Sequence, residues 1–144
     1  MRARLAAAVA LGMAAPAGAQ SASAAFDAYR AYPATAGDWT HVVTAGGNEA
    51  RFGGHFIIRC DRATRLVLLQ RLASPGSTAG AMIITTDTAL RSFAASSVRL
   101  GARDPLLDAI AFSRGRFVVS GGGGTALILP SWPEAARSVE DCRN

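Results

Sequence analysis

The segment FGGHFIIRCDRATRLVLLQRL, residues 52–72, decides the fold class of this chain. It contains two runs rich in apolar and β-branched residues, Phe52–Cys60 and Arg65–Leu72, and the short polar loop Asp61–Thr64 separates them. Runs of this length and composition are typical of β-strands, and a short loop between two such runs is typical of a hairpin. We therefore expect two neighbouring antiparallel strands here.

Further strand patterns occur on both sides of this hairpin. They are Trp39–Val43, Met82–Thr86, Leu90–Ala94, Arg116–Ser120 and Thr125–Leu129. Because helices do not alternate with these strands, the sheet should be mainly antiparallel. We therefore predict an α+β domain, a mainly antiparallel sheet or sandwich of about seven strands with two short helices.

Two segments carry the signals that begin a helix. Asp104, followed by proline and an apolar helical face, is typical of an N-cap, and this helix should end near Gly115. Ser131 and Glu134 have the spacing of a capping box, which predicts a second helix at the C-terminus.

The two cysteines, Cys60 and Cys142, both lie in predicted apolar surroundings. A period of two places Cys60 on one strand face with Phe56 and Ile58. Cys142 closes a stripe at helical spacing made of Trp132, Ala135, Ala136 and Val139. We expect one disulfide that pins the last helix to the sheet and stabilises the fold by about 4 kcal/mol in the chain-entropy model. A redox-active thiol is less favoured, because the Cys-x-x-Cys motif is absent.

The N-terminus has the pattern of a secretory signal peptide. Arg2 and Arg4 precede the apolar run Leu5–Ala15, and the small residues Ala17-Gly18-Ala19 follow it. We expect cleavage after Ala19 and a periplasmic or secreted protein without a transmembrane segment. The expected organisation is a signal peptide at 1–19, a flexible lead-in at 20–37, which holds a short helix or a loose chain, and one β-rich domain at 38–144.

All fifteen basic residues are arginine, and the formal net charge is +5. Without lysine the chain cannot perform Schiff-base catalysis, use a Ser-Lys dyad or supply the lysine of a phosphate-binding loop. The arginines are scattered along the sequence, so a nucleic-acid partner is not expected.

No catalytic, metal or cofactor site is predicted. The chain lacks Gly-x-Ser-x-Gly and Ser-x-x-Lys motifs and any Cys-His pairing. His41 and His55 fall in different predicted strands without a further ligand at metal spacing, so we interpret both as ordinary strand residues. The loop Gly121–Gly124 precedes a strand and not a helix, which favours a flexible hairpin loop over a phosphate cradle.

Two tryptophans and one basic segment are further candidate binding features. Trp39 and Trp132 could stack on a sugar or peptide, but packing in the core is favoured, since Trp132 belongs to the buried helical stripe. Ser113–Arg116 lies at a predicted helix end, where arginine complements the helix dipole, so a structural role is favoured over anion binding.

The segment Leu106–Cys142 combines a helix, the strand around Phe112–Val119, a glycine loop, Leu127–Pro130 and an amphipathic helix. It resembles the C-terminal half of the invasion-associated locus B family and related small periplasmic proteins of alphaproteobacteria. The stretch Cys60–Gln70 is similar to that family's strand with a cysteine and a glutamine. The resemblance implies an exported, β-rich, disulfide-bonded protein without established catalytic residues.

The sequence thus predicts an exported, non-catalytic periplasmic domain with a binding or envelope-support role. Its partner would be an envelope protein or a glycan, bound through surface loops and arginines. The alternative is a small periplasmic inhibitor of a lysozyme or a protease. A hydrolase is less favoured, because it would need polar residues that only the fold brings together.

Overall fold

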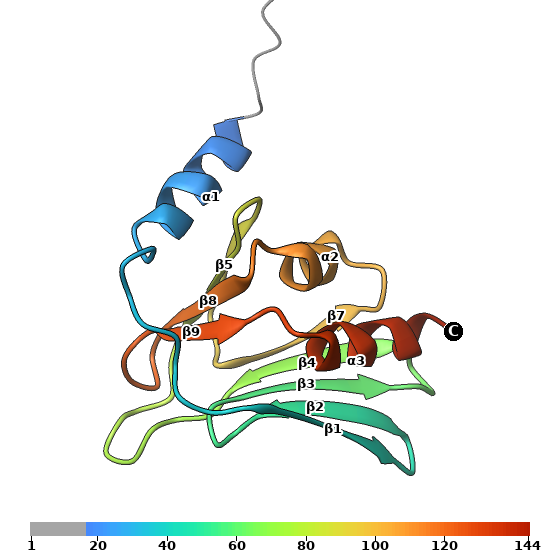
Figure 1. Ribbon diagram of the computed structural model, residues 1–144. Coiled ribbons are helices and arrows are strands. Elements are labelled where there is room, and N and C mark those ends of the chain that lie inside the picture. The colour runs from blue at the N-terminus through green and yellow to red at the C-terminus, as the bar shows by residue number, and fades with distance from the viewer. Residues whose placement is uncertain (1–16) are drawn as a thin grey trace, which may run out of the picture.

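The computed structural model describes residues 17–144, and in it all strands pair antiparallel in two sheets (Figure 1). The predicted signal peptide, residues 1–19, lies outside the described residues except for 17–19, which begin a helix. The larger sheet has the order β1-β2-β3-β4-β7, with β1 (Trp39–Thr44), β2 (Gly47–Phe52), β3 (Phe56–Asp61), β4 (Leu66–Arg71) and β7 (Ser97–Gly101). The smaller sheet has the order β6-β5-β8-β9, with β6 (Leu90–Phe93), β5 (Met82–Thr85), β8 (Arg116–Gly121) and β9 (Leu127–Pro130).

In the described part of the chain three helices accompany the sheets: α1 (Ala17–Asp27), α2 (Pro105–Phe112) and α3 (Pro133–Arg143). In Figure 1 the smaller sheet, α2 and α3 all lie on the upper side of the larger sheet, whose lower face is bare. The predicted α+β class with mainly antiparallel sheets and a C-terminal helix is confirmed. Within residues 17–144, no helix has the length and apolar character needed to cross a membrane.

The region 17–144 contains nine strands, more than the expected seven or so, because two were missed. The first is β2, of which the predicted strand 52–60 contains only Phe52, and a turn at Gly53–His55 separates that residue from β3. Gly53 has φ +50°, and the His55 N–H donates to the carbonyl of Phe52 at 3.0 Å, which closes the turn. Gly53 therefore reverses the chain, and Phe52 ends one strand while Phe56 begins the next.

The second missed strand is β7, which pairs with β4 and forms one edge of the larger sheet. Its core-facing residues are Val98, which packs against the core, and Leu100, which is buried in it. The other residues of the strand are exposed. This is the period-two pattern of a half-buried strand, over only five residues.

The core fills the space between the two sheets. Its largest buried side chains include Phe52, Phe56, Phe117, Met82 and Ile84. Trp39 is also buried, stacks with Phe117, and donates its indole N–H to the carbonyl of Pro130 at 2.8 Å. The core role expected for this tryptophan is confirmed.

The predicted disulfide is present and joins β3 to α3. Cys60 and Cys142 are 82 residues apart in the sequence, and their Cα atoms are 5.4 Å apart. Both residues are buried, and α3 packs across β1, β2 and β3. The C-terminal helix is therefore fastened to the core side of the larger sheet.

The two predicted helix starts have different outcomes. Asp104 is the N-cap of α2, and its carboxylate accepts the Leu106 N–H at 2.9 Å. The capping box at Ser131 and Glu134 is wrong, since Trp132 is the N-cap of α3 and makes no side-chain cap. The Ser131 hydroxyl and one Glu134 carboxylate oxygen are buried without a hydrogen-bond partner. Trp132 is 44 % exposed, so its expected place in the buried stripe is also wrong, because the helix begins after it.

The segment 20–37, expected as a lead-in, contains most of α1, which contacts β5 and β6. Beyond the helix, Thr35 joins the edge of the smaller sheet. Its N–H donates to the Ile128 carbonyl at 2.9 Å, and its hydroxyl accepts the Ile128 N–H at 2.8 Å. The short helix weighed for this segment is therefore present.

Candidate functional site

The bare face of the larger sheet, which we call the outer face, is the candidate site. Side chains alternate between the two faces of a strand, so every second residue points away from the core. The strand registers align these residues in three rows across the sheet. The middle row is Val42, Glu49, Arg59, Leu68 and Arg99. The flanking rows are Thr44, Gly47, Asp61, Leu66 and Gly101 on one side, and Thr40, Arg51, Ile57, Gln70 and Ser97 on the other.

Glu49 lies between two arginines of the outer face. The Nε of Arg59 donates to Glu49 Oε2 at 2.7 Å, and the Nε of Arg51 donates to Oε1 at 3.0 Å. Only 8 % of Glu49 is exposed. Burial raises the pKa of Glu49, but the hydrogen bonds from Arg59 and Arg51 outweigh burial and leave it below its ordinary value. Glu49 therefore stays ionised and neutralises one of the two guanidinium charges.

Asp61 is held by its own turn. Its carboxylate accepts the backbone N–H groups of Ala63 at 3.0 Å and Thr64 at 3.2 Å. The hydrogen bonds from Thr64 lower the pKa of Asp61, with smaller contributions from Ala63 and from the charge of Arg99. Neither Asp61 nor Glu49 is suited to hold a proton near neutral pH, which makes both poor general acids.

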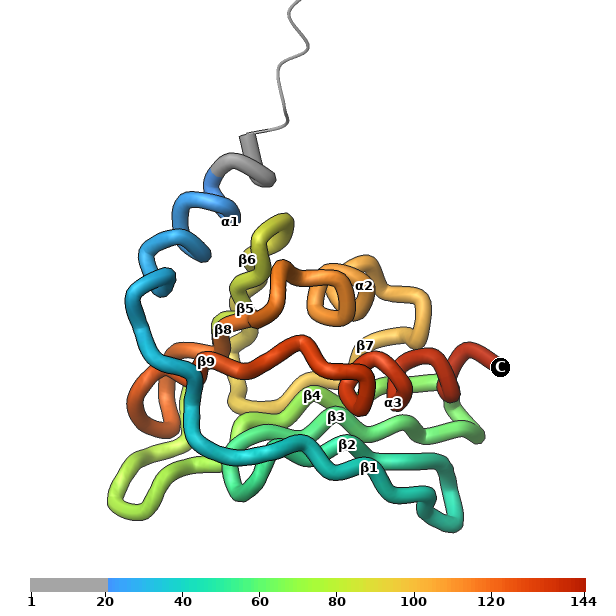
Figure 2. Tube along the Cα trace, in the orientation of Figure 1, coloured from blue at the N-terminus to red at the C-terminus, as the bar shows by residue number. Residues whose placement is uncertain are grey.

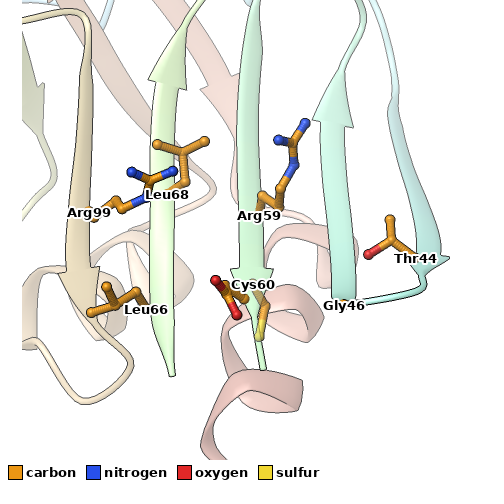
Figure 3. A pocket seen from close by; sticks show the side chains of 8 residues that line it. Thr44, Gly46, Arg59, Cys60, Leu66, Leu68 and Arg99 are labelled. Atoms are coloured by element: carbon orange, nitrogen blue, oxygen red, sulfur yellow. The ribbon is translucent and has the colours of Figure 1, made fainter. Parts of the chain in front are cut away.

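Arg99 is the cation of this face that is left for a ligand. It is exposed, and among the described residues it makes no hydrogen bond or ion pair. Leu68 lies beside it in the row, and Arg59 follows on the next strand (Figure 3). An apolar side chain therefore stands between two guanidinium groups, which is a combination suited to a carboxylate with an apolar neighbour.

The outer face is hollowed around these residues. A depression of about 290 Å³ is lined by Thr44, Gly46, Arg59, Cys60, Asp61, Leu66, Leu68 and Arg99. A second depression, of about 280 Å³, shares Leu68 and Arg99 with it and extends to Gln70 and Ser97. Together they make a shallow hollow that crosses β3, β4 and β7.

Glycines keep part of this surface open. A Cβ added at Gly46 or Gly101 would meet no atom within 4 Å. Gly101 is the register partner of Leu66, which lines the first depression. The lack of a side chain at these two positions therefore leaves room for a ligand.

The structure does not bring the two histidines together with metal-binding partners. His41 lies in β1 under α3, with a side chain only 9 % exposed, and its Nε2 is 3.8 Å from Asp141 Oδ2. His55 lies in the turn before β3, so its expected place in a strand is wrong. Within residues 17–144 no group of three or more candidate ligands is found.

The glycine loop connects β8 to β9, as expected for a hairpin, and it packs around a buried arginine. Arg71 donates to the carbonyls of Val119 at 3.3 Å and of Thr125. A Cβ at Gly123 would lie 3.0 Å from the Arg71 Nε, and Gly123 has φ +101°. The loop therefore makes room for Arg71.

The basic segment after α2 also makes structural contacts. Arg114 binds Asp87 at 3.1 Å, and Arg116 donates to the carbonyl of Tyr32 at 3.1 Å. These contacts tie the segment to the β5–β6 loop and to the chain after α1. The structural role expected for Ser113–Arg116 is the one that these contacts support.

The residues of the outer face were not singled out from the sequence. The only signal was the period-two pattern of β3, which sets Arg59 opposite Cys60. Arg99 had no such signal, because β7 was not predicted. The alignment of Arg59 with Arg99 depends on the order of the strands, which the sequence does not reveal.

Comparison of the chain with protein-family models, with curated protein sequences and with solved structures finds no match. The resemblance to the invasion-associated locus B family therefore stays a prediction from the sequence.

Proposed function

We propose that this chain is an exported, non-catalytic binding domain whose outer face holds an acidic segment of an envelope protein. The observation that carries the proposal is the row Arg59–Leu68–Arg99, which lies on the bare side of the larger sheet. Charge-assisted hydrogen bonds from arginine to carboxylate are roughly twice as strong as hydrogen bonds between neutral groups.

The distance between Arg59 and Arg99 indicates how far apart the two carboxylates of the ligand should be. Neighbouring strands are about 4.8 Å apart, so the backbones that carry Arg59 and Arg99 are separated by roughly 10 Å. A peptide in the polyproline II conformation has three residues per turn and rises about 3.1 Å per residue, so side chains three apart lie on the same side, separated by about this distance. We therefore expect a ligand of the type Glu-Leu-Leu-Glu. One of its carboxylates binds Arg99, the other binds the guanidinium N–H groups of Arg59 that Glu49 leaves unused, and the apolar part contacts Leu68.

The environment of the two carboxylates on the face supports a binding role. Glu49 and Asp61 are both hydrogen-bonded and have lowered pKa values. Neither accepts a hydrogen bond from Arg99, and the charged Glu49 orients Arg59 and Arg51.

The binding experiment uses a fluorescent peptide containing Glu-Leu-Leu-Glu and the disulfide-bonded protein. Arg99→Gln should weaken binding about tenfold or more, since a hydrogen bond to a charged group contributes roughly 1.5–3 kcal/mol. The matched control is Arg137→Gln, because Arg137 is exposed on α3 and makes no hydrogen bond or ion pair among the described residues. Equal effects of the two substitutions, or binding of an acidic glycan with no binding of the peptide, would contradict the proposal.

Export is tested separately. The basic head, the apolar run and the Ala17-Gly18-Ala19 site favour cleavage before Gln20. The disulfide agrees with an oxidising compartment. The intact mass of protein recovered from the periplasm should correspond to a chain that begins at Gln20. Uncleaved protein found in the cytoplasm would refute this localisation.

A further inference from the structure

We infer that strand β1 pairs antiparallel with β1 of a second copy of this chain. This inference goes beyond the proposed function, since it concerns the edge of the larger sheet and not its outer face. It follows from four features of β1: its position, its exposure, its lack of charge and its self-complementary sequence.

Strand β1 is an uncovered edge. Among residues 17–144 it is the end strand of the larger sheet and pairs only with β2, and it runs along the lower border of the molecule (Figure 2). Helix α3 packs on one face of this region. Val42 is 52 % exposed and Val43 is 75 % exposed. An edge strand presents unpaired N–H and C=O groups that accept another strand.

The other edges carry features that oppose such pairing. Strand β7 has the exposed Arg99 in its middle, so two copies pairing about its centre would bring like charges together. In strand β9 the N–H and the carbonyl of Ile128 are both already hydrogen-bonded to Thr35. Strand β6 carries Arg91, which binds Asp104, and is contacted by α1. In contrast, Trp39–Thr44 contains no acidic residue, arginine, lysine or proline.

The sequence of β1 complements itself about Val42. A two-fold axis through this residue sets Val42 opposite Val42 of the second copy. The same register sets His41 opposite Val43 and Thr40 opposite Thr44. Pairs of β-branched residues, including Thr with Thr, stabilise antiparallel strands across the interface. A two-fold interface of this kind closes after two copies.

Pairing in this register would join two five-stranded sheets into one. The middle row of the outer face would run from Arg99 through Val42 into the same row of the second copy, so the two binding surfaces would lie on one continuous face. The contact involves short strands and few side chains, which places it at the small end of stable interfaces. We therefore expect a concentration-dependent dimer with a dissociation constant roughly in the micromolar range.

The first test measures the oligomeric state by sedimentation equilibrium of the disulfide-bonded protein without any peptide. The wild-type protein should shift from monomer to dimer as concentration rises. Val42→Lys should abolish the shift, whereas Val42→Thr should retain it. The matched control is Leu90→Lys, because Leu90 is 46 % exposed on another edge strand and should tolerate the change without loss of the dimer. Circular dichroism checks that each variant is folded.

The second test checks the register by oxidation of a single added thiol. Val42→Cys should form a crosslinked dimer, because residues 42 of the two copies face each other, whereas Leu90→Cys should remain monomeric. A wild-type protein that stays monomeric up to about 1 mM, well above the expected dissociation constant, would overturn the inference. Equal crosslinking of the two cysteine variants would overturn it as well. Neither result depends on whether the outer face binds an acidic peptide.

Discussion

The Arg71 guanidinium donates a hydrogen bond to the backbone carbonyl of Thr125, across the space between the two sheets. It also donates to Val119, and the residue is almost fully buried. Burial lowers the pKa of Arg71, yet the group stays charged because the ordinary value for arginine is far above neutral. The hydrogen bonds of Arg71 therefore link β4 to the glycine loop.

Replacement of Arg71 should destabilise the fold. Arg71→Ala removes the donor to the buried carbonyl of Val119 and to the partly buried carbonyl of Thr125, and it opens a cavity, so the free energy of unfolding should fall by about 3 kcal/mol. The measurement is urea unfolding followed by tryptophan fluorescence. Arg137→Ala is the exposed control and should change stability by less than about 0.5 kcal/mol. A similarly small effect of Arg71→Ala would show that the hydrogen bonds of Arg71 do not stabilise the fold.

The disulfide should contribute strongly to stability. Because it closes a loop with a sequence separation of 82, replacement of Cys60 and Cys142 together with serine should lower the free energy of unfolding by about 2–4 kcal/mol. Helix α3 should lose protection first, which amide hydrogen exchange measures. Unchanged exchange in α3 after reduction would mean that packing alone holds the helix.

Asp104 should make stability depend on acid pH. Hydrogen bonds from Arg91 lower the pKa of Asp104 below its ordinary value of 3.8, against the opposing effect of burial. A lowered folded-state pKa adds stability that is fully present above the unfolded value and is lost as pH falls through the folded value. The free energy of unfolding should therefore fall below about pH 4.

Two substitutions separate the roles of Asp104. Asp104→Ala removes both the cap of α2 and the ion pair with Arg91, and should cost about 1–2 kcal/mol at neutral pH. Asp104→Asn keeps a capping oxygen and should cost less. Both variants should flatten the loss of stability below about pH 4. An unchanged pH profile in either variant would assign the acid sensitivity to other carboxylates, such as Glu49.

Gly101 should tolerate a side chain that blocks the outer face. Its Cβ would extend into open space beside Leu66, so Gly101→Leu should leave stability unchanged or slightly higher. The same change should weaken binding of the Glu-Leu-Leu-Glu peptide about tenfold by filling the depression. Gly54→Leu is the matched control, because a Cβ there also meets nothing within 4 Å but lies in the β2–β3 turn. Full binding by Gly101→Leu would place the ligand elsewhere.

Several features of the fold could be predicted because they depend on nearby residues. The hairpin around Asp61, the cap at Asp104 and the inward positions of both cysteines follow from local patterns and were confirmed. Strand β2 was missed because Gly47, Asn48 and Glu49 are poor strand formers. Glu49 is buried there only because two arginines from the folded sheet bind it.

The candidate site could not be predicted for a related reason. Arg59 and Arg99 share a row only because β7 adds beside β4, on the far side from β3. The exposure of Trp132 and the lack of a partner for the Ser131 hydroxyl likewise depend on where the chain leaves β9 and enters α3. Strand order and chain direction come from tertiary packing, which residue spacing does not encode.

The most direct test of the central claim is to map where the acidic peptide binds by NMR. Titration of the isotope-labelled, disulfide-bonded protein with the Glu-Leu-Leu-Glu peptide should shift the amide signals of β3, β4 and β7, and the side-chain signals of Arg59 and Arg99. Signals from α2 and the smaller sheet should stay in place. Shifts confined to residues around the exposed Phe112 or the exposed Trp132, with the outer face unaffected, would contradict the account.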